Sequence, residues 1–243
     1  MRIFSLIPAR SGSKRLSHKN IQKIGSKSLL QIAIQTSLEV ASIDSTYIIT
    51  DSPKYESHAL QYGAKTLGLR PPETASDDSP DVSWLNWFFS RLQDSSCLTG
   101  NELYVILRPT SPFRTARTIQ SAITFFIENS SDPYTCLRAV KLVSEHPGKM
   151  WRLFGPTRMR QILPYTHGDG VFWSDSQSLI LPKVYVQNAS LEIGTINSYL
   201  LDTHFPTSGY TTIPFVMTAL ESMDINTELD LEFARFLYAK SLS

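Results

Sequence analysis

Cysteine is nearly absent from this chain of 243 residues, which contains only Cys97 and Cys136. Neither belongs to a CxxC pair or lies near a histidine at the spacing of metal ligands, so the sequence predicts neither a disulfide framework nor a zinc site. No apolar run approaches the ~20 residues of a membrane span, and the apolar stretch before Arg10 is shorter than a signal peptide. We therefore expect a cytoplasmic protein that does not bind a membrane.

Acidic residues are missing from the first 38 positions, and Glu39 is the first carboxylate of the chain. The same segment contains seven of the 23 lysines and arginines, although the formal net charge of the whole chain is only +1. This near-neutral total gives no reason to expect nucleic acid as a partner. A basic segment without carboxylates favours a localised anion site, with a solvated basic turn as the alternative.

Strand and helix patterns alternate along the first half of the chain. The patterns predict strands at 3–9, 46–50, 64–69 and 102–110, and helices at 28–41, 53–63, 81–93 and 115–129. Strands separated by helices of this length imply right-handed crossovers and a mostly parallel, Rossmann-like doubly wound α/β sheet. Asp81 is expected to cap its helix, and Trp84 of the same helix is expected to pack in the core.

The pattern changes after residue 143. Residues 144–182 are irregular and rich in Pro, Gly, Arg and His, so we expect an inserted arm there rather than core. Two further strands and a last helix are predicted at 184–196, 210–217 and 227–240. Leu229, Phe233 and Phe236 share one face of that amphipathic helix. No internal repeat or linker divides the chain, and residues 1–243 are expected to form a single domain.

Four polar segments lie at the expected ends of these elements. They are PARSGSKR at 8–15, LRPPETASDDS at 69–79, RPTSPFR at 108–114 and SMDINTELD at 222–230. Ligands of open parallel sheets bind outside the carboxyl ends of the strands, so we expect the four segments to converge there.

The first of these loops contains neither the GxGxxG of dinucleotide sites nor the GxxxxGK[ST] of a P-loop. Asp51 follows the second strand, as the ribose-binding acid of a dehydrogenase does, but the missing glycine turn argues against that interpretation. The loop instead offers backbone N–H groups around Gly12 and Ser13, which suit a polyphosphate. The cations within reach are Arg10, Lys14, Arg15 and Lys19.

These segments together resemble the CMP-sugar synthetases, the cytidylyltransferases that activate sialic acid and related 2-keto sugar acids. In the family's order, the matching segments are IPARSGSKRLSHKN, RPPETASDDS, RPTSPFR, HPGKMW, LPKVYVQNAS and SMDINTELDLEFA. The resemblance covers nearly the whole chain and implies a nucleotidyltransferase-type fold. It also implies CTP and a 2-keto sugar acid as substrates, Mg²⁺ as the divalent cation, and a homodimer in which the 144–182 arm reaches the neighbour's sugar site.

The resemblance implies a role for each matching position. Positions matching CTP contacts are Arg10, Ser13, Lys14, Lys19, Asn20, Arg70 and Ser76, and the catalytic candidates among them are Arg10, Lys14 and Lys19. Positions matching or facing the acceptor sugar are Arg108, Lys149, Asn188 and Glu192. Asp224 matches a metal-ligating carboxylate, and Asn226 occupies the second metal position.

The chain departs from the family's pattern where the sugar and the metal bind. Arg108 and Glu192 replace a glutamine and an aromatic residue, so we expect an acceptor other than plain sialic acid. Asn226 replaces the second aspartate of a DID pattern and brings no charge, so another carboxylate is needed. The candidates are Asp230, Asp77 and Asp78. Alternatively, Asp224 only caps the last helix.

Two rival functions remain open from the sequence. One is the synthetase for the eight-carbon lipopolysaccharide sugar, which shares the fold. The other is a CTP-binding regulatory or scaffold protein that has lost catalysis, which the amide at Asn226 would favour.

Overall fold

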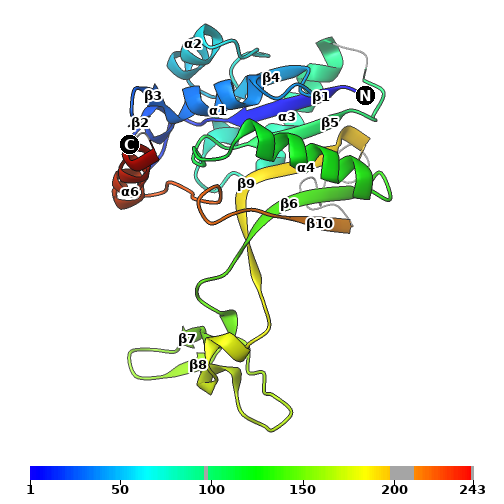
Figure 1. Ribbon diagram of the computed structural model, residues 1–243. Helices are drawn as coiled ribbons and strands as arrows, with labels where there is room; N and C mark the ends of the chain where they lie inside the picture. Colours follow the sequence, from blue (N-terminus) through cyan, green and yellow to red (C-terminus); the bar gives the residue numbers. More distant parts are fainter. Residues whose placement is uncertain (96–97, 198–210, 242–243) are drawn as a thin grey trace.

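The computed structural model describes residues 1–95, 98–197 and 211–241, so Cys97 lies outside the described residues. Its centre is a six-stranded sheet with the order β10-β6-β9-β5-β1-β4 (Figure 1). The strands are β1 Ile3–Pro8, β4 Ser45–Ile49, β5 Leu103–Leu107, β6 Thr135–Leu142, β9 Tyr185–Thr195 and β10 Thr211–Val216. β9 runs antiparallel to β5 and β6, whereas the other pairs are parallel. The predicted mostly parallel sheet is confirmed.

Helices cover both faces of this sheet. They are α1 Leu29–Leu38, α2 Pro53–Gln61, α3 Asp81–Ser95, α4 Ala116–Asn129 and α6 Glu228–Ser241. Side chains alternate along β1, so that Ile7 packs with α1, α2 and α4 on one face while Leu6 packs with α3 on the other. Trp84 of α3 is buried in the second cluster, as predicted. Burial on both faces explains why β1 and β5 are almost continuously apolar.

Short elements connect this framework. A two-stranded sheet joins β2 Lys23–Ile24 to β3 Lys27–Ser28, and a second joins β7 Trp151–Leu153 to β8 Met159–Gln161. The 3₁₀ helices are η1 Lys19–Ile21, η2 Pro72–Ala75, η3 Pro147–Lys149, η4 Trp173–Asp175 and η5 Ser178–Ile180.

The strand predicted at residues 64–69 does not form. Only Lys65 pairs with β4, in an isolated bridge whose two backbone hydrogen bonds measure 2.7 and 2.9 Å. Gly63 and Gly68 have φ angles of 89° and 97°, so the chain turns before and after that contact. The apolar pattern between them is therefore too short to make a ladder.

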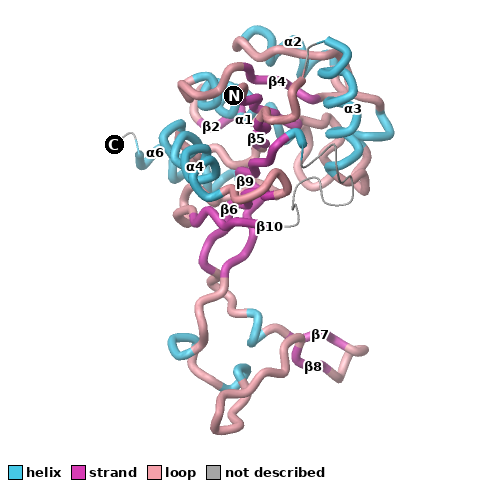
Figure 2. Tube along the Cα trace, turned by 90° about the vertical axis from the view of Figure 1, so that its right-hand side faces the viewer, coloured by secondary structure: helices cyan, strands magenta, loops and turns pink. Residues whose placement is uncertain are grey.

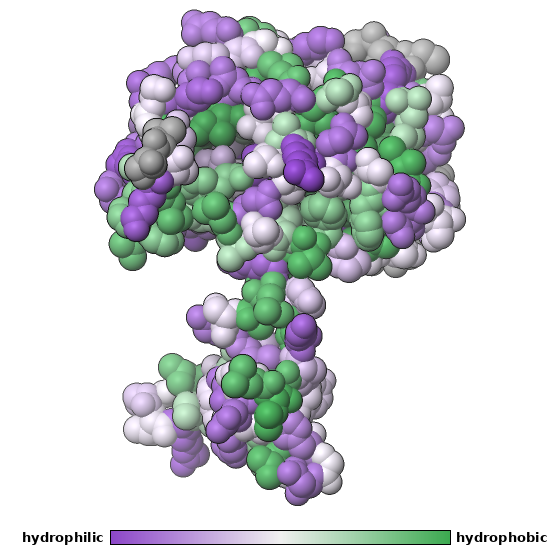
Figure 3. Space-filling model, viewed as in Figure 1, coloured by the Kyte–Doolittle hydropathy of each residue, from purple (hydrophilic) through white to green (hydrophobic). Residues whose placement is uncertain are grey.

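The irregular segment at 144–182 projects away from the sheet as an arm (Figures 1 and 2). β6 and β9 lead into it, and it contains β7, β8 and three of the 3₁₀ helices. Its apolar side chains are unusually exposed: Leu153 is 73% and Leu179 94% exposed. Figure 3 shows apolar residues gathered on the visible face of this arm. Dimerisation through the arm stays a prediction.

The last helix packs differently from its predicted orientation. Leu231 and Ala234 of α6 are buried against the loop after β1 and the β2–β3 hairpin. Leu229, Phe233 and Phe236 do share a face, but they are 78%, 53% and 53% exposed. The helix buries the face that carries Leu231 and Ala234, because Leu16, Ile24 and Leu29 pack against it, and α6 thereby holds the loop after β1 in place.

Candidate active site

Segments far apart in the sequence enclose one cavity of about 270 Å³ at the carboxyl edge of the sheet. They are the loops after β1 and β5 and the segments before α3 and α6, so the predicted convergence is confirmed. Its lining comprises Pro8, Arg10, Ser13, Lys19, Asn20, Arg70, Thr74, Ser76, Asp77, Ser79, Asp81, Trp84, Arg108, Pro109, Thr110, Asp224 and Asn226. A second hollow of about 300 Å³ shares part of this lining and adds Lys14, Arg15 and Leu16.

The loop after β1 is held in shape by two polar anchors. The Ser11 backbone N–H and hydroxyl donate to the Asp51 carboxylate at 2.9 and 2.6 Å. The Asn20 amide donates to the Arg10 carbonyl oxygen at 3.0 Å, which closes the loop on itself. Asp51 therefore folds this loop from the end of β4, and its carboxylate is not free for a ribose.

Two residues that are predicted to bind the triphosphate, Arg10 and Lys14, pair with a carboxylate across the cavity. The guanidinium of Arg10 lies 2.5 Å and the ammonium of Lys14 2.7 Å from the two oxygens of Asp77. These contacts lower the pKa of the Asp77 carboxyl, first through the hydrogen bond from Lys14, and they raise the pKa of Lys14. In this structure the Asp77 carboxylate is thus engaged by two cations, and an anionic ligand that took its place on Arg10 and Lys14 would release it.

The remaining cations of the loop converge on Asn226. Its side-chain oxygen accepts hydrogen bonds from Lys19 at 3.2 Å and from Arg15 at 3.0 Å. Burial lowers the pKa of the Lys19 ammonium, nearby Arg15 and Arg10 add to the effect, and Asp224 opposes it. The Asn226 oxygen therefore links two cations of the loop in this structure, and its role as a metal ligand stays a prediction.

Arg70 forms the end of the cavity next to β4. Its backbone N–H donates to the Thr50 carbonyl oxygen at 2.9 Å, and the residue is 4% exposed. Burial lowers the pKa of the guanidinium. Its Nε is buried and has no hydrogen-bond partner among the described residues, although most buried donors have one. Arg70 lines the cavity together with the polar side chains of Thr74 and Ser76, and a polar cavity end of this kind suits a polar ligand edge such as a pyrimidine base.

Asp224 lies at the cavity wall, where it accepts a hydrogen bond of 2.5 Å from the Asn226 amide. It does not cap α6. Thr227 and Asp230 form a reciprocal capping box: the Thr227 N–H donates to Asp230 at 2.8 Å, and the Asp230 N–H donates to the Thr227 hydroxyl at 3.3 Å. The alternative reading of Asp224 as the helix cap is therefore wrong, and Asp230 is committed to the cap.

Of the four predicted sugar residues, the structure brings only Arg108 and Glu192 together, in an ion pair of 2.8 Å. Of the four, only Arg108 lines the cavity. Lys149 lies in the arm on η3. Asn188 is buried, donates to the Ser222 hydroxyl at 2.9 Å and accepts from the Ser190 N–H at 3.0 Å. Glu192 is 1% exposed and lies behind Arg108.

Asp81 and Trp84 line the cavity although sequence reasoning assigned them to a cap and to the core. The Asp81 carboxylate accepts hydrogen bonds from the Trp84 indole N–H at 2.8 Å and from Arg108 at 2.6 Å, and among the described residues it accepts none from a backbone N–H of α3. The predicted cap is therefore wrong. The position of Asp81 in the sequence could have predicted its place in the cavity, because it closely follows the ASDDS segment that was already assigned to the site.

The fold and cavity define an α/β nucleotide-binding protein with a cationic cradle at the carboxyl edge of its sheet. A family model described as cytidylyltransferase matches residues 4–150, and the chain belongs to this family. The chain is 30% identical over 233 residues to the N-acylneuraminate cytidylyltransferase of Escherichia coli O18:K1:H7, covering 96% of this chain and 51% of that protein. It thus spans about half the length of this relative.

Two further similarities agree with this family. The CMP-N,N'-diacetyllegionaminic acid synthase of Legionella pneumophila is 27% identical over 231 residues, which cover 95% of this chain and 93% of that protein. A structure titled CMP:2-keto-3-deoxy-manno-octonic acid synthetase complexed with CTP aligns with a TM-score of 0.70 at 16% identity, over 99% and 100% of the two chains. The latter supports the fold alone. Within the described residues, no helix is long and apolar enough to span a bilayer.

Proposed function

We propose that this chain transfers CMP from CTP to a sialic-acid-like 2-keto sugar acid and releases pyrophosphate. The observation that carries the proposal is one cavity whose lining combines Arg10, Lys19 and Asp224 with the buried Arg70. Cations at one end suit a triphosphate, and a buried polar end suits the base. Membership of the cytidylyltransferase family and the named relatives support the same reaction.

In this reaction the anomeric hydroxyl of the sugar attacks the α-phosphorus of CTP, and the bond to the β-phosphate oxygen breaks. Charge changes occur on phosphate oxygens that are already anionic, so catalysis depends mainly on positioning and on neutralisation by cations. Arg10, Lys14 and Lys19 bind the triphosphate and then the leaving pyrophosphate. Asp51 and Asn20 keep the loop in the shape that aims these cations.

Mg²⁺ is the proposed divalent cation, and Asp224 is the residue that fits it. Its carboxylate lines the cavity and, among the described residues, receives a single hydrogen bond, from the side-chain amide of Asn226, so other lone pairs stay open. The described residues contain no group of three or more His, Cys, Asp or Glu side chains that could hold an ion. Mg²⁺ usually takes one or two carboxylates plus substrate phosphates and waters, which matches this arrangement. When bound, the ion neutralises phosphate charge.

Pyrophosphate release from CTP tests the proposal directly. The acceptors to compare are N-acetylneuraminic acid, N,N'-diacetyllegionaminic acid and 2-keto-3-deoxy-manno-octonic acid. Turnover with a nine-carbon acid supports the proposal, and turnover only with the eight-carbon acid favours the rival synthetase. Binding of CTP with no pyrophosphate released from any acceptor would favour the regulatory or scaffold alternative.

The acceptor is expected to differ from plain N-acetylneuraminate. Arg108 stands in the cavity wall paired with Asp81 and Glu192, where the resemblance places uncharged side chains. Such a wall is polar and rich in hydrogen-bond acceptor oxygens. A sugar acid with other substituents, such as N,N'-diacetyllegionaminate, should therefore give a higher kcat/KM than N-acetylneuraminate. Competition between the two acids in one reaction measures this preference. Clear preference for N-acetylneuraminate would contradict it.

We also propose a homodimer. The arm exposes apolar side chains that few contacts within this chain cover, including Leu153, Leu179 and Ile180. Apolar exposure of this kind typically marks an interaction surface. Light scattering at micromolar concentration should give twice the chain mass, and Leu179→Asp should lower it toward the monomer while the circular dichroism spectrum is preserved. A monomer mass for the unmodified protein at that concentration would refute the dimer.

The proposed place of action is the cytoplasm. CTP, the substrate that the cavity is proposed to hold, is a cytoplasmic nucleotide, and the chain contains only two cysteines.

A further inference from the structure

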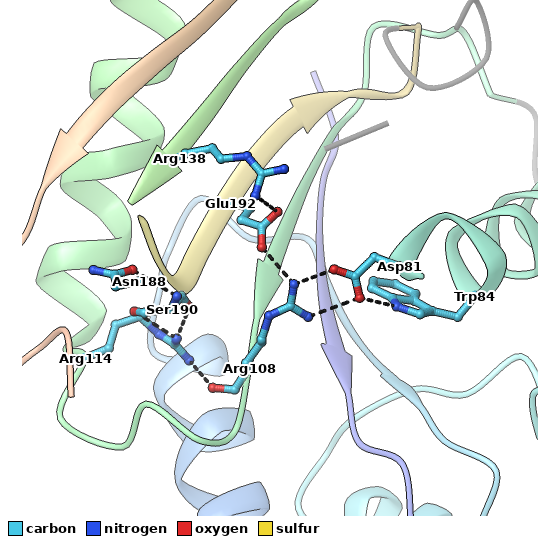
Figure 4. A network of polar contacts seen from close by, with 8 residues as sticks. All are labelled: Asp81, Trp84, Arg108, Arg114, Arg138, Asn188, Ser190 and Glu192. Carbon is cyan, nitrogen blue, oxygen red and sulfur yellow. Dashed lines mark hydrogen bonds and ion pairs between the residues drawn. The ribbon is translucent and has the colours of Figure 1, made fainter. Parts of the chain in front are cut away.

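Four charged side chains make one continuous series of contacts behind the cavity wall (Figure 4). Arg108 Nη2 donates to Asp81 Oδ2 at 2.6 Å and to Glu192 Oε1 at 2.8 Å, and Arg138 Nη1 lies 3.3 Å from Glu192 Oε2. We call this series the Asp81–Arg138 network. Charges alternate in sign along it, so the network is neutral as a whole. Asp81 and Arg108 line the cavity, whereas Glu192 lies wholly behind it.

The sheet dictates the position of Glu192. Its Cα pairs with Ile106 of β5 on one side and with Arg138 of β6 on the other. Its neighbours Leu191 and Ile193 pack on the opposite face with α1 and α4, because side chains alternate along a strand. The Glu192 carboxylate therefore lies on the face of α3, where Arg108 and Asp81 meet it. Buried charges of this kind usually stabilise less than well-packed apolar residues would, so folding alone does not explain the network.

The charge of Arg108 is compensated within the network, although its Nε–H and one N–H of Nη1 are not used there. Both N–H groups of its Nη2 are used by Asp81 and Glu192, and Nη1 makes a longer contact of 3.4 Å with Asp81. Asp81, in contrast, keeps 37% of its side chain exposed. Burial acts to raise the pKa of the Asp81 carboxyl, but Arg108 and the Trp84 indole N–H outweigh it, and the pKa is lowered. The wall therefore presents an ionised hydrogen-bond acceptor rather than a free cation.

The strand order indicates which substrate meets this wall. β1 lies between β4 and β5, and the cationic loop follows β1. Arg70 occupies the β4 end of the cavity, which suits the base, while Arg108 follows β5 at the other end. With the triphosphate over β1 and the base toward β4, the acceptor sugar lies toward β5.

We propose that Glu192 is a positioning residue in the selection of the acceptor sugar, an inference that rests on the proposed function. Glu192 holds Arg108, and Arg108 in turn holds Asp81 against the sugar. The wall selects sugar acids that present hydroxyl or acylamino N–H groups to Asp81. It does not bind the sugar's carboxylate, because Arg108 is already neutralised by two carboxylates.

The test compares Glu192→Gln with a matched variant, Glu102→Gln. Glu102 is also buried and paired with an arginine, Arg2 at 2.7 Å, but it precedes β5 at the end away from the cavity. Glu192→Gln removes the charge that holds Arg108, so Asp81 should no longer be held against the sugar. KM for the best sugar acid of the three should rise by about tenfold, the effect of losing the hydrogen bond between the sugar and the charged Asp81. KM for CTP should stay unchanged. Glu102→Gln should lower the melting temperature without changing either KM.

Two double variants make the result decisive. Glu192→Gln/Arg138→Gln keeps the charge balance, so it should fold and still show the raised acceptor KM. In an Arg108→Gln background, adding Glu192→Gln should change the KM for the acceptor sugar little, because Glu192 acts on the sugar only through Arg108. An unchanged acceptor KM in folded Glu192→Gln, or a loss of discrimination between CTP and UTP instead, would overturn the positioning role. If the unmodified protein turns over none of the sugar acids, the proposed function is refuted. Binding of the sugar acids is then measured by calorimetry, and equal affinity of the unmodified protein and of Glu192→Gln would refute the positioning role independently.

Discussion

Lys19→Ala and Arg10→Ala are expected to lower kcat/KM for CTP by about 10²–10³-fold, the usual effect of removing one positioned donor to developing phosphate charge. Both side chains line the cavity, and Lys19 is held there beside Asn226 at 3.2 Å. The fold should survive, because neither side chain belongs to the apolar clusters of the sheet. Initial rates of pyrophosphate release at subsaturating CTP measure the effect.

Lys27→Ala is the matched control for these variants. It removes the same charge from the same basic stretch, but Lys27 is exposed on β3 and does not line the cavity. Its turnover should equal that of the unmodified protein. Near-normal turnover of Lys19→Ala and of Arg10→Ala would show that the loop after β1 is not the triphosphate cradle.

Asp224→Asn is expected to abolish turnover even at high Mg²⁺, while CTP still binds through the cationic loop. The structure supports this because Asp224 lines the cavity and Asp230 is occupied as the partner of Thr227 in the α6 capping box. Asp230→Asn is therefore the control: it weakens the capping-box contact and removes a favourable negative charge from the first turn of α6, so it should lower the melting temperature slightly. It should leave the Mg²⁺ dependence of turnover unchanged.

Asn226→Asp completes this comparison. It places a carboxylate beside Asp224, which the Asn226 amide now contacts at 2.5 Å, and two adjacent carboxylates favour a divalent cation between them. Mg²⁺ is titrated into the protein without substrate in an isothermal calorimeter. Mg²⁺ should bind more tightly to Asn226→Asp than to the unmodified chain. The assignment is reversed if Asp224→Asn stays active while Asn226→Ala does not.

The fold was predictable where one pattern has one physical meaning. Continuous apolar runs bounded by polar loops gave β1 and β5, because both faces of these strands are buried. The same pattern failed at 64–69, where Gly63 and Gly68 turn the chain and leave one paired residue. Helical periodicity located α6 but not its buried face, because that face is decided by what the helix packs against, namely the loop after β1.

The site was predictable to the extent that loops at strand ends converge. That rule brought Arg10, Lys19, Arg70 and Asp224 to one cavity. The charge pair of Arg108 and Glu192 was suggested instead by the resemblance, which places both residues at the sugar site, and the structure shows this pair at 2.8 Å. The antiparallel insertion of β9 between β5 and β6, which buries Glu192 behind Arg108, cannot be read from the spacing of distant segments. Asp81 was assigned to a cap for a similar reason: its partner, Arg108, is distant in the sequence.

The most direct test of the proposed reaction is analysis of its products. Purified protein, Mg²⁺, CTP and each of the three sugar acids are incubated separately, and the mixture is examined by mass spectrometry together with a pyrophosphate assay. The proposal predicts a CMP–sugar adduct and pyrophosphate in equal amounts, with at least one nine-carbon acid and with no product when the sugar is omitted. CTP that binds the protein but yields no CMP–sugar with any of the acids would contradict it.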